Sequence, residues 1–283
     1  MFNTKCRNIS AELLNEKINN AKIITEDLTG KPIDLSQFTF KLVKLHRCLG
    51  IYENNEIKIN KNLKLNKLEP TIVHELSHGL QDEENLISNL NAKSNLKSLE
   101  NNYIFRQCII ESFAYFNDSW ATFTNKSNMN LYEKRAGIIT TLFSNISFKE
   151  FKKSFHLIKN LDIKINPNNK KVVIDQLNLD RLVKNSNSDK VLGSAIAIIS
   201  FIANDFSILK TSQALFKDWK NILYNLNTNL NDATIKLHKI QDNLIKIVSE
   251  VRKSDKCIIS DLIRRKSNKS IISDLIRKEI NRL

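Results

Sequence analysis

Residues 71–82, TIVHELSHGLQD, constrain the fold of this chain more than any other segment. His74 and His78 are four residues apart, and this spacing places both imidazoles on one face of a helix. From that face the two imidazoles can bind one metal cation together, with Glu75 projecting beside it. The segment therefore predicts a zinc-binding helix in which His74 and His78 are ligands and Glu75 is a general base.

A catalytic zinc ion usually has a third protein ligand and keeps one position open for water. Glu111 is the best candidate, because it lies in an apolar helical segment, CIIESFAYFNDSW, and the small Ala114 allows that helix to pack close to the zinc helix. Glu84 is the next candidate, although it lies near the end of the histidine helix. It would need a sharp turn to reach the metal, and no glycine is present there to form one. The third histidine of the metzincin pattern is missing, because positions 81 and 84 hold Gln and Glu.

Three further residues are candidates for supporting roles around such a site. Asp118 lies two helical turns past Glu111 and can orient a ligand imidazole, but we favour a solvated carboxylate at this position. Tyr115 and Tyr132 are candidate donors to the oxyanion of a hydrolytic transition state.

The chemistry expected of these residues is hydrolysis of a peptide bond, with Zn²⁺ as the cofactor. Zinc lowers the pKa of a bound water to about 7, and Glu75 accepts the proton of that water as it attacks a carbonyl carbon. Glu75 then passes the proton to the leaving amine. A peptide or protein substrate is favoured, because an edge strand can align an extended chain through main-chain hydrogen bonds.

The sequence HELSHGLQD, followed by ESFA at residues 111–114, resembles the gluzincin-type zinc metallopeptidases. Their pattern is His-Glu-Leu-Thr-His-Ala-Leu-Gln-Asp, with Glu-Gly-x-Ala further along the chain. The resemblance covers roughly residues 50 to 125. It implies a zincin-like fold, Glu111 as the third zinc ligand, and a substrate cleft bordered by the strand around Ile57.

The chain departs from that pattern at two places. Ser112 and Phe113 replace a Gly and an acidic residue, and the family's later Tyr-x-x-Gly reads KVLG at residues 190–193. The second departure removes a tyrosine expected to help stabilise the oxyanion. The alternative function is therefore a catalytically weak, zinc-stabilised binding protein.

The fold class expected is α+β, mainly helical, because only 5 Gly and 3 Pro interrupt the chain. Residues 9–21 carry apolar side chains at helical spacing before Gly30. Residues 38–42 and 57–59 alternate instead, and Asn54-Asn55 suits a hairpin turn. We expect a small N-terminal antiparallel β-sheet and a helical C-terminal region.

Further elements follow from local patterns. We expect Asn66 to cap the zinc helix, with Pro70 in its first turn and an end near Asp82. Residues 103–123 predict a second helix, and residues 163–174 predict a hairpin. The longest apolar stretch, residues 191–203, is shorter than the roughly 20 residues of a membrane span and predicts a buried helix, so no transmembrane segment is expected.

Three regions are expected: a zincin-like catalytic region (1–125), a helical region that completes the cleft (126–253) and a basic amphipathic tail (254–283). In the tail, the segment IISDLIR occurs twice, 13 residues apart. Apolar positions in residues 226–251 alternate gaps of four and three, as in a heptad seam. The seam predicts a long helix in an intramolecular bundle or, alternatively, self-association.

The formal net charge is +14, and residues 251–283 hold ten Lys or Arg against four Asp or Glu. This tail is the segment where a polyanion or an acidic partner would bind. A third interpretation takes the tail and the heptad seam as the main function, a basic helical module for nucleic acid or an anionic surface.

The compartment expected is the cytoplasm. The N-terminus lacks the apolar core of a secretory signal. The cysteines Cys6, Cys48, Cys108 and Cys257 are far apart and are expected to be free thiols in a reducing environment.

Overall fold

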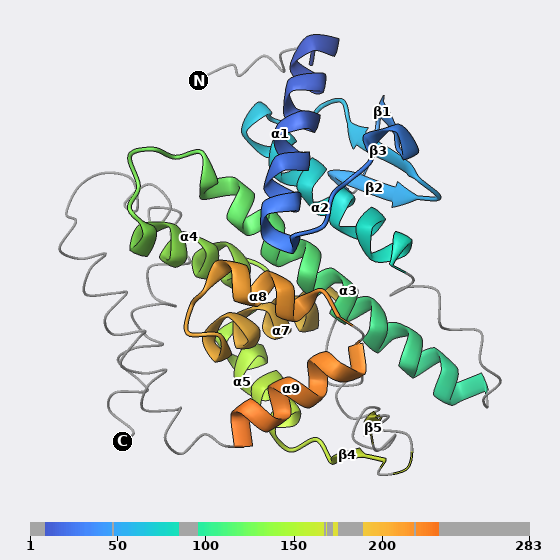
Figure 1. Cartoon of the computed structure of the whole chain (residues 1–283), viewed down its shortest axis with the longest axis vertical. Helices are drawn as coiled ribbons and strands as arrows, with labels where there is room; N and C mark the ends of the chain where they lie inside the picture. Colours follow the sequence, from blue (N-terminus) through green and yellow to red (C-terminus); the bar gives the residue numbers. More distant parts are fainter. Residues whose placement is uncertain are drawn as a thin grey trace.

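The computed structural model describes residues 9–46, 48–84, 96–166, 168, 172–174, 189–217 and 219–231. It confirms a mainly helical α+β chain with a small sheet (Figure 1). The helices are α1 (Ala11–Thr29), α2 (Leu65–Glu83), α3 (Leu96–Thr124), α4 (Leu131–Phe143), α5 (Phe148–Lys159), α7 (Asp189–Ala203), α8 (Ile208–Leu215) and α9 (Trp219–Asn231). The strands are β1 (Thr39–Val43), β2 (Gly50–Glu53), β3 (Glu56–Asn60), β4 (Ile163–Ile165) and β5 (Val172–Ile174), and a 3-10 turn covers Leu35–Gln37.

The opening helix α1 begins and ends at residues suited to those positions. The Ser10 side chain accepts a hydrogen bond from the main-chain N–H of Leu13, as a helix N-cap does. Gly30 ends the helix at φ 70°, a left-handed conformation in which its N–H donates to the Glu26 carbonyl. The prediction of a helix stopped by Gly30 is confirmed.

The three-stranded sheet is mixed, so the prediction of an antiparallel sheet is wrong in one of its two pairings. β2 and β3 form the predicted hairpin, with Asn54 at φ 49° and Asn55 at φ 61°, but β1 runs parallel to β3 in the order β1-β3-β2. Alternation along a strand does not reveal its partner. The long connection from β1 to β2 is held by Asn60, whose Nδ2 donates to the carbonyls of Leu45 and Cys48.

The two faces of the sheet have different environments. Ile57 and Ile59 of β3 are fully buried in a core shared with α1 and α2. The opposite face carries charged side chains, where Lys58 pairs across to Glu53 of β2 at 3.1 Å and along its own strand with Glu56 at 3.2 Å. One apolar face therefore holds the sheet against α2.

Helix α2 begins earlier than predicted, and the predicted cap at Asn66 is wrong. The N-cap is Lys64, whose side chain makes no capping hydrogen bond, while its carbonyl accepts from the Lys67 N–H at 2.8 Å. Because the helix already begins at Leu65, Pro70 lies beyond the first turn and removes one main-chain hydrogen bond. The helix ends at Glu83, one residue past the prediction.

Helix α3 crosses the molecule and packs against α2 on one side and α7 on the other (Figure 1). It begins at Leu96, earlier than the predicted start at residue 103. The prediction started too late because the first turns of the helix are polar and show no apolar period. The predicted buried helix at residues 191–203 is confirmed as α7, where Ala195 and Ile196 are fully buried. The predicted β4–β5 hairpin is confirmed as well.

The remaining predictions on the C-terminal part lie mostly outside the described residues. Leu226, the first position of the predicted heptad seam, is buried in α9. The rest of the seam beyond residue 231 and the tail at 254–283 are not described, so their partners stay predictions. None of the helices in the part of the chain that is described is long and apolar enough to cross a membrane.

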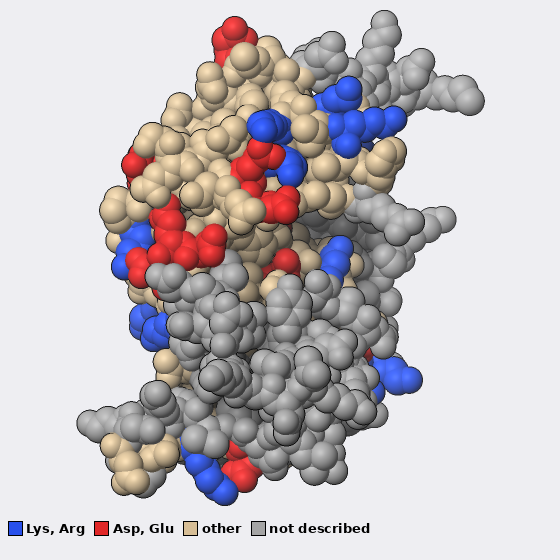
Figure 2. All heavy atoms as spheres, turned by 90° about the vertical axis from the view of Figure 1, so that its right-hand side faces the viewer, with Lys and Arg blue, Asp and Glu red and all other residues tan. Residues whose placement is uncertain are grey.

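Acidic side chains gather on one face of the molecule, over the C-terminal end of α2 (Figure 2). Burial and the nearby charges of Asp34, Glu84 and Asp82 raise the pKa of Glu83. The described surface is thus not uniformly basic, despite the formal net charge of +14.

Gly193 lies where α7 crosses α3 and makes a testable contribution to stability. A Cβ there would be 2.8 Å from the carbonyl oxygen of Cys108 and 3.2 Å from the Cβ of Glu111. We expect Gly193→Ala to lower the free energy of unfolding by about 1–3 kcal/mol. The added methyl group would meet the main chain of α3, so the two helices would have to move apart. Chemical denaturation measures the loss. Gln213→Ala, at an exposed position of α8, is the control and should change it by less than about 0.5 kcal/mol.

Candidate metal centre

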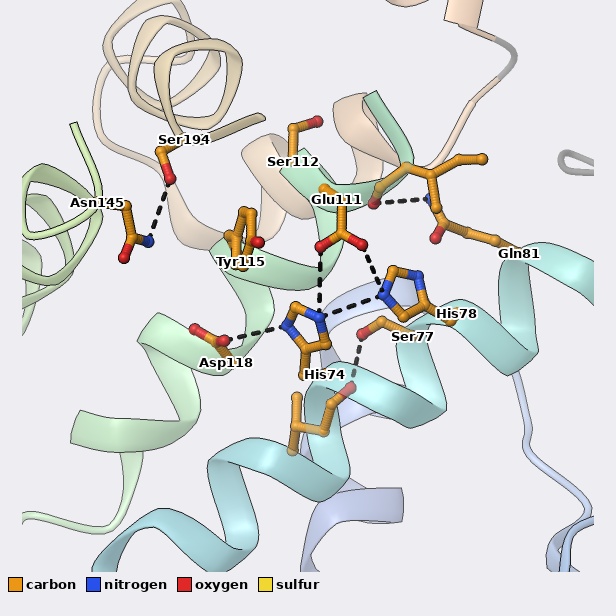
Figure 3. Close-up of polar contacts among 12 residues, drawn as sticks. His74, Ser77, His78, Gln81, Glu111, Ser112, Tyr115, Asp118, Asn145 and Ser194 are labelled. Atoms are coloured by element: carbon orange, nitrogen blue, oxygen red, sulfur yellow. Dashed lines mark hydrogen bonds and ion pairs between the residues drawn. The ribbon is translucent and has the colours of Figure 1, made fainter. Parts of the chain in front are cut away.

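Helices α2 and α3 bring the three predicted ligands together (Figure 3). The Nε2 atoms of His74 and His78 are 3.2 Å apart. The Glu111 carboxylate spans the pair, with Oε2 3.5 Å from His74 Nε2 and Oε1 3.5 Å from His78 Nε2. Ligand atoms of all three residues lie within 4.8 Å of one another.

These distances fit a bound metal ion. Zinc binds nitrogen at about 2.0–2.1 Å, so two ligand atoms at neighbouring corners of a tetrahedral site are about 3.3 Å apart. The separations of 3.2 Å and 3.5 Å lie close to that value. Two imidazole nitrogens and one carboxylate form a donor set typical of divalent metals. The cluster can therefore hold a metal ion.

Asp118 orients the His74 imidazole, and our preference for a solvated carboxylate at this position is wrong. Its Oδ2 lies 3.1 Å from His74 Nδ1 (Figure 3). When Nδ1–H donates to this carboxylate, Nε2 presents its lone pair to the cluster. Asp118 and Glu111 are seven residues apart on α3, which brings both carboxylates to the same helix face.

Gln81, which in the sequence marks only a departure from the metzincin pattern, is a neighbour of the site. It is almost fully buried, and its Nε2 lies 3.5 Å from the Ile110 carbonyl. Its Oε1 is buried without a well-formed hydrogen bond and faces the His78 ring (Figure 3). The three-residue spacing from His78, one helical turn, was the signal that could have found it.

The protonation states of His78 and Glu111 suit metal binding. Burial and the charge of His74 lower the pKa of His78 to about 4, although Glu111 and the Gln81 amide act in the opposite direction. Burial raises the pKa of Glu111, but contacts with His74, His78 and Tyr115 outweigh burial and lower it to about 2. Near neutral pH these groups are a neutral imidazole and a carboxylate, the forms that bind metals.

His74 is the ligand whose proton a metal would displace. Burial lowers its pKa, but hydrogen bonds to Asp118 and Glu111 and the nearby Glu75 carboxylate outweigh that effect, so the pKa stands well above its usual value. A cation that binds Nε2 takes the place of this proton.

The other candidate ligand and the two tyrosines have different positions. Glu84 is at the C-cap of α2, where its carboxylate pairs with Lys31 at 2.7 Å, outside the cluster. The Tyr115 ring lies 5.2 Å from the His74 ring, between centroids, and its hydroxyl helps to lower the pKa of Glu111. Tyr132 is in α4, and its side chain lies outside the described part.

Glu75 is buried between α2 and the sheet, with 5% of its surface exposed. Burial raises its pKa to about 7, and the charges of Glu111 and Asp118 add to this effect. The charge of His74 and a hydrogen bond from the main-chain N–H of Tyr52 act in the opposite direction and lower the pKa of Glu75. The predicted base therefore lies next to the ligands and against strand β2.

A buried polar chain behind the ligands holds α2 and α3 in register. Asn117 Nδ2 donates to Ser77 Oγ at 3.0 Å, and Ser212 Oγ of α8 donates to Asn117 Oδ1 at 3.0 Å. All three side chains are fully buried. Because Ser77 lies between the two histidines in sequence and Asn117 precedes Asp118, the chain fixes the helix faces that carry the site.

The chain matches no family model, no curated protein and no solved structure. The functional interpretation therefore depends on the site itself.

The contact between Asp118 and His74 leads to a prediction. We expect Asp118→Ala to weaken Zn²⁺ binding by about 10–100-fold, because the His74 ring loses the acceptor that orients it. Competition with a chromophoric chelator measures the affinity. Asp162→Ala is the control, since Asp162 is half exposed and pairs with Lys164. Equal affinities of the two variants would contradict an orienting role.

Proposed function

We propose that this protein is a zinc-dependent metallopeptidase of the gluzincin type. The observation that carries the proposal is the convergence of His74, His78 and Glu111 in one cluster beside the buried Glu75. Two imidazoles and one carboxylate are the ligand set of catalytic zinc in several hydrolases. The resemblance of HELSHGLQD and ESFA to gluzincins supports the same assignment.

The metal and the chain have separate parts in the proposed reaction. A bound zinc ion would supply Lewis-acid activation of water and of the substrate carbonyl. His74, His78 and Glu111 would hold that ion, while Asp118 holds the His74 imidazole in place.

Glu75 performs the proton transfers. Its carboxylate accepts a proton from the attacking water and delivers it to the amine nitrogen that leaves. A pKa raised to about 7 by burial suits this role, because an effective base has a pKa near the working pH.

A peptide substrate is favoured by the position of strand β2. Within the described residues β2 pairs with β3 alone, so it is an edge strand, and an edge strand can align an extended chain through main-chain hydrogen bonds. The resemblance implied that the strand around Ile57 borders the cleft, but Ile57 lies on the central strand β3. The strand that contacts Glu75 is β2, through Gly50. The helix α2, the sheet beside it and the carboxylate on α3 together support a zincin-like arrangement.

The cytoplasm remains the compartment that we propose. Cys48 and Cys108, the cysteines in the described part, are thiols outside any disulfide, as expected in a reducing environment.

Metal analysis and a casein-type protease assay test the proposal. We expect one zinc per chain, turnover of the substrate, loss of turnover with a chelator, and its return on adding Zn²⁺. A protein that holds one zinc per chain without turnover would contradict the enzyme assignment. That result would favour the zinc-stabilised binding protein.

A further inference from the structure

Gly50, the first residue of β2, lies directly against Glu75. A Cβ at position 50 would be 2.6 Å from Oε1 of Glu75, 2.9 Å from its Cγ and 2.9 Å from Cγ2 of Thr71. Non-bonded carbon atoms prefer about 3.5–4.0 Å. No side chain larger than hydrogen fits here while Glu75 keeps its place.

The backbone conformation does not account for a glycine at this position. Only Gly30 among the glycines, all of which are described, has a positive φ. A glycine within a strand weakens the strand, and it often marks a close approach of another group to the backbone. At Gly50 the approaching group is the carboxylate of the proposed base.

Tyr52 makes a second connection between the same strand and α2. Residues two apart in a strand face the same side, so Tyr52 follows Gly50 on the side of α2. A hydrogen bond from its main-chain N–H lowers the pKa of the Glu75 carboxyl. The Tyr52 hydroxyl lies 2.9 Å from Oδ2 of Asp82, near the end of α2. Strand β2 is therefore connected to α2 at Glu75 and again at Asp82.

We infer that Gly50 is a positioning residue for Glu75, and that the bare main chain of β2 fixes where the carboxylate of the base lies. The catalytic consequence of this inference rests on the proposed function. A methyl group at position 50 displaces the end of the Glu75 side chain first, because that end is the flexible partner in the contact. The three ligands lie on α2 and α3 and keep their arrangement.

The substitution Gly50→Ala in the full chain tests the inference. We expect kcat on a casein-type substrate to fall by about 10–100-fold, the usual effect of misplacing a catalytic group by about 1 Å. KM and Zn²⁺ affinity should stay within about twofold, because neither depends on the Glu75 carboxylate in this role. An unchanged kcat in a zinc-loaded Gly50→Ala protein would overturn the inference.

Gly137→Ala is the matched control. Its Cβ would meet the Phe123 ring at 2.6–2.8 Å, a contact as close as that at Gly50 but with no residue of the site. We expect this variant to lose stability and to keep kcat. If both variants lose kcat to the same extent, general destabilisation accounts for the effect and the positioning role is wrong.

A thermodynamic cycle tests the contact without using activity. We expect Gly50→Ala to raise the unfolding equilibrium constant by about tenfold or more in the native chain. In a Glu75→Ala background the increase should be at least about threefold smaller, since the main obstacle is gone while Thr71 remains. Equal increases in the two backgrounds would overturn the inference. This outcome can be measured even if the native chain shows no turnover. Such absence of turnover would by itself count against the proposed function alone.

Discussion

Glu75→Gln is expected to reduce kcat on a peptide substrate by about 10²–10⁴-fold, the usual contribution of a general base. Glutamine keeps the length and shape of the side chain but cannot accept the proton of the attacking water. One zinc per chain should remain bound, because the proposed ligands His74, His78 and Glu111 are unchanged. Steady-state kinetics with metal analysis of the same sample checks both parts.

Glu84→Gln is the matched control, because Glu84 follows α2 and pairs with Lys31 outside the cluster. It should keep kcat. Turnover of Glu75→Gln near that of the native protein would exclude Glu75 as the base.

The pH dependence of kcat/KM should report the same group. Burial raises the pKa of Glu75 to about 7, and the ionised carboxylate is the active form. Activity should therefore fall as the pH falls through the pKa of Glu75, and a bound cation, which favours the carboxylate, places that limb at or below pH 7. The limb should be lost in Glu75→Gln.

Glu111→Ala is expected to weaken Zn²⁺ binding by more than about 100-fold. Loss of a residue that only orients a ligand costs up to roughly that factor, and loss of a ligand should cost more. The substitution removes the proposed ligand on α3 and leaves two imidazoles on α2. Competition with a chromophoric chelator measures the affinity, and the metal content after dialysis gives an independent value. Hydrolysis should be lost together with the metal.

Glu84→Ala provides the comparison for this prediction. The structure places Glu84 in an ion pair with Lys31, so its loss should leave Zn²⁺ affinity unchanged. If Glu84→Ala loses zinc and Glu111→Ala keeps it, the third ligand is Glu84, and the assignment of Glu111 is wrong.

Features with a local period were predictable from the sequence. The four-residue spacing of His74 and His78 places them on one helix face whatever the rest of the chain does, because an α-helix turns once in 3.6 residues. The stop at Gly30 and the hairpin turn at Asn54-Asn55 follow from conformations that few other residues adopt. The class of the fold and the identity of the ligand helix depended on such local rules alone.

The start of the ligand helix was local too, but it was predicted wrongly. Asn66 has a side chain suited to capping, yet the helix starts at Leu65 with no side-chain cap. Capping contributes only about 1 kcal/mol. Burial of residues such as Leu68 and Ile72 against the sheet contributes more and decides where the helix packs.

Contacts between distant segments were decided by the tertiary structure. Three such contacts join residues that no repeating pattern in the sequence connects. They are the parallel pairing of β1 with β3, the contact of Asp118 with His74 and the approach of Gly50 to Glu75. The sequence by itself determined a helix with two imidazoles and a carboxylate on adjoining faces. Packing of α3 between α2 and α7 decided which other side chains meet these three groups. The burial of apolar faces is non-directional, so only the complete core selects one arrangement of the helices.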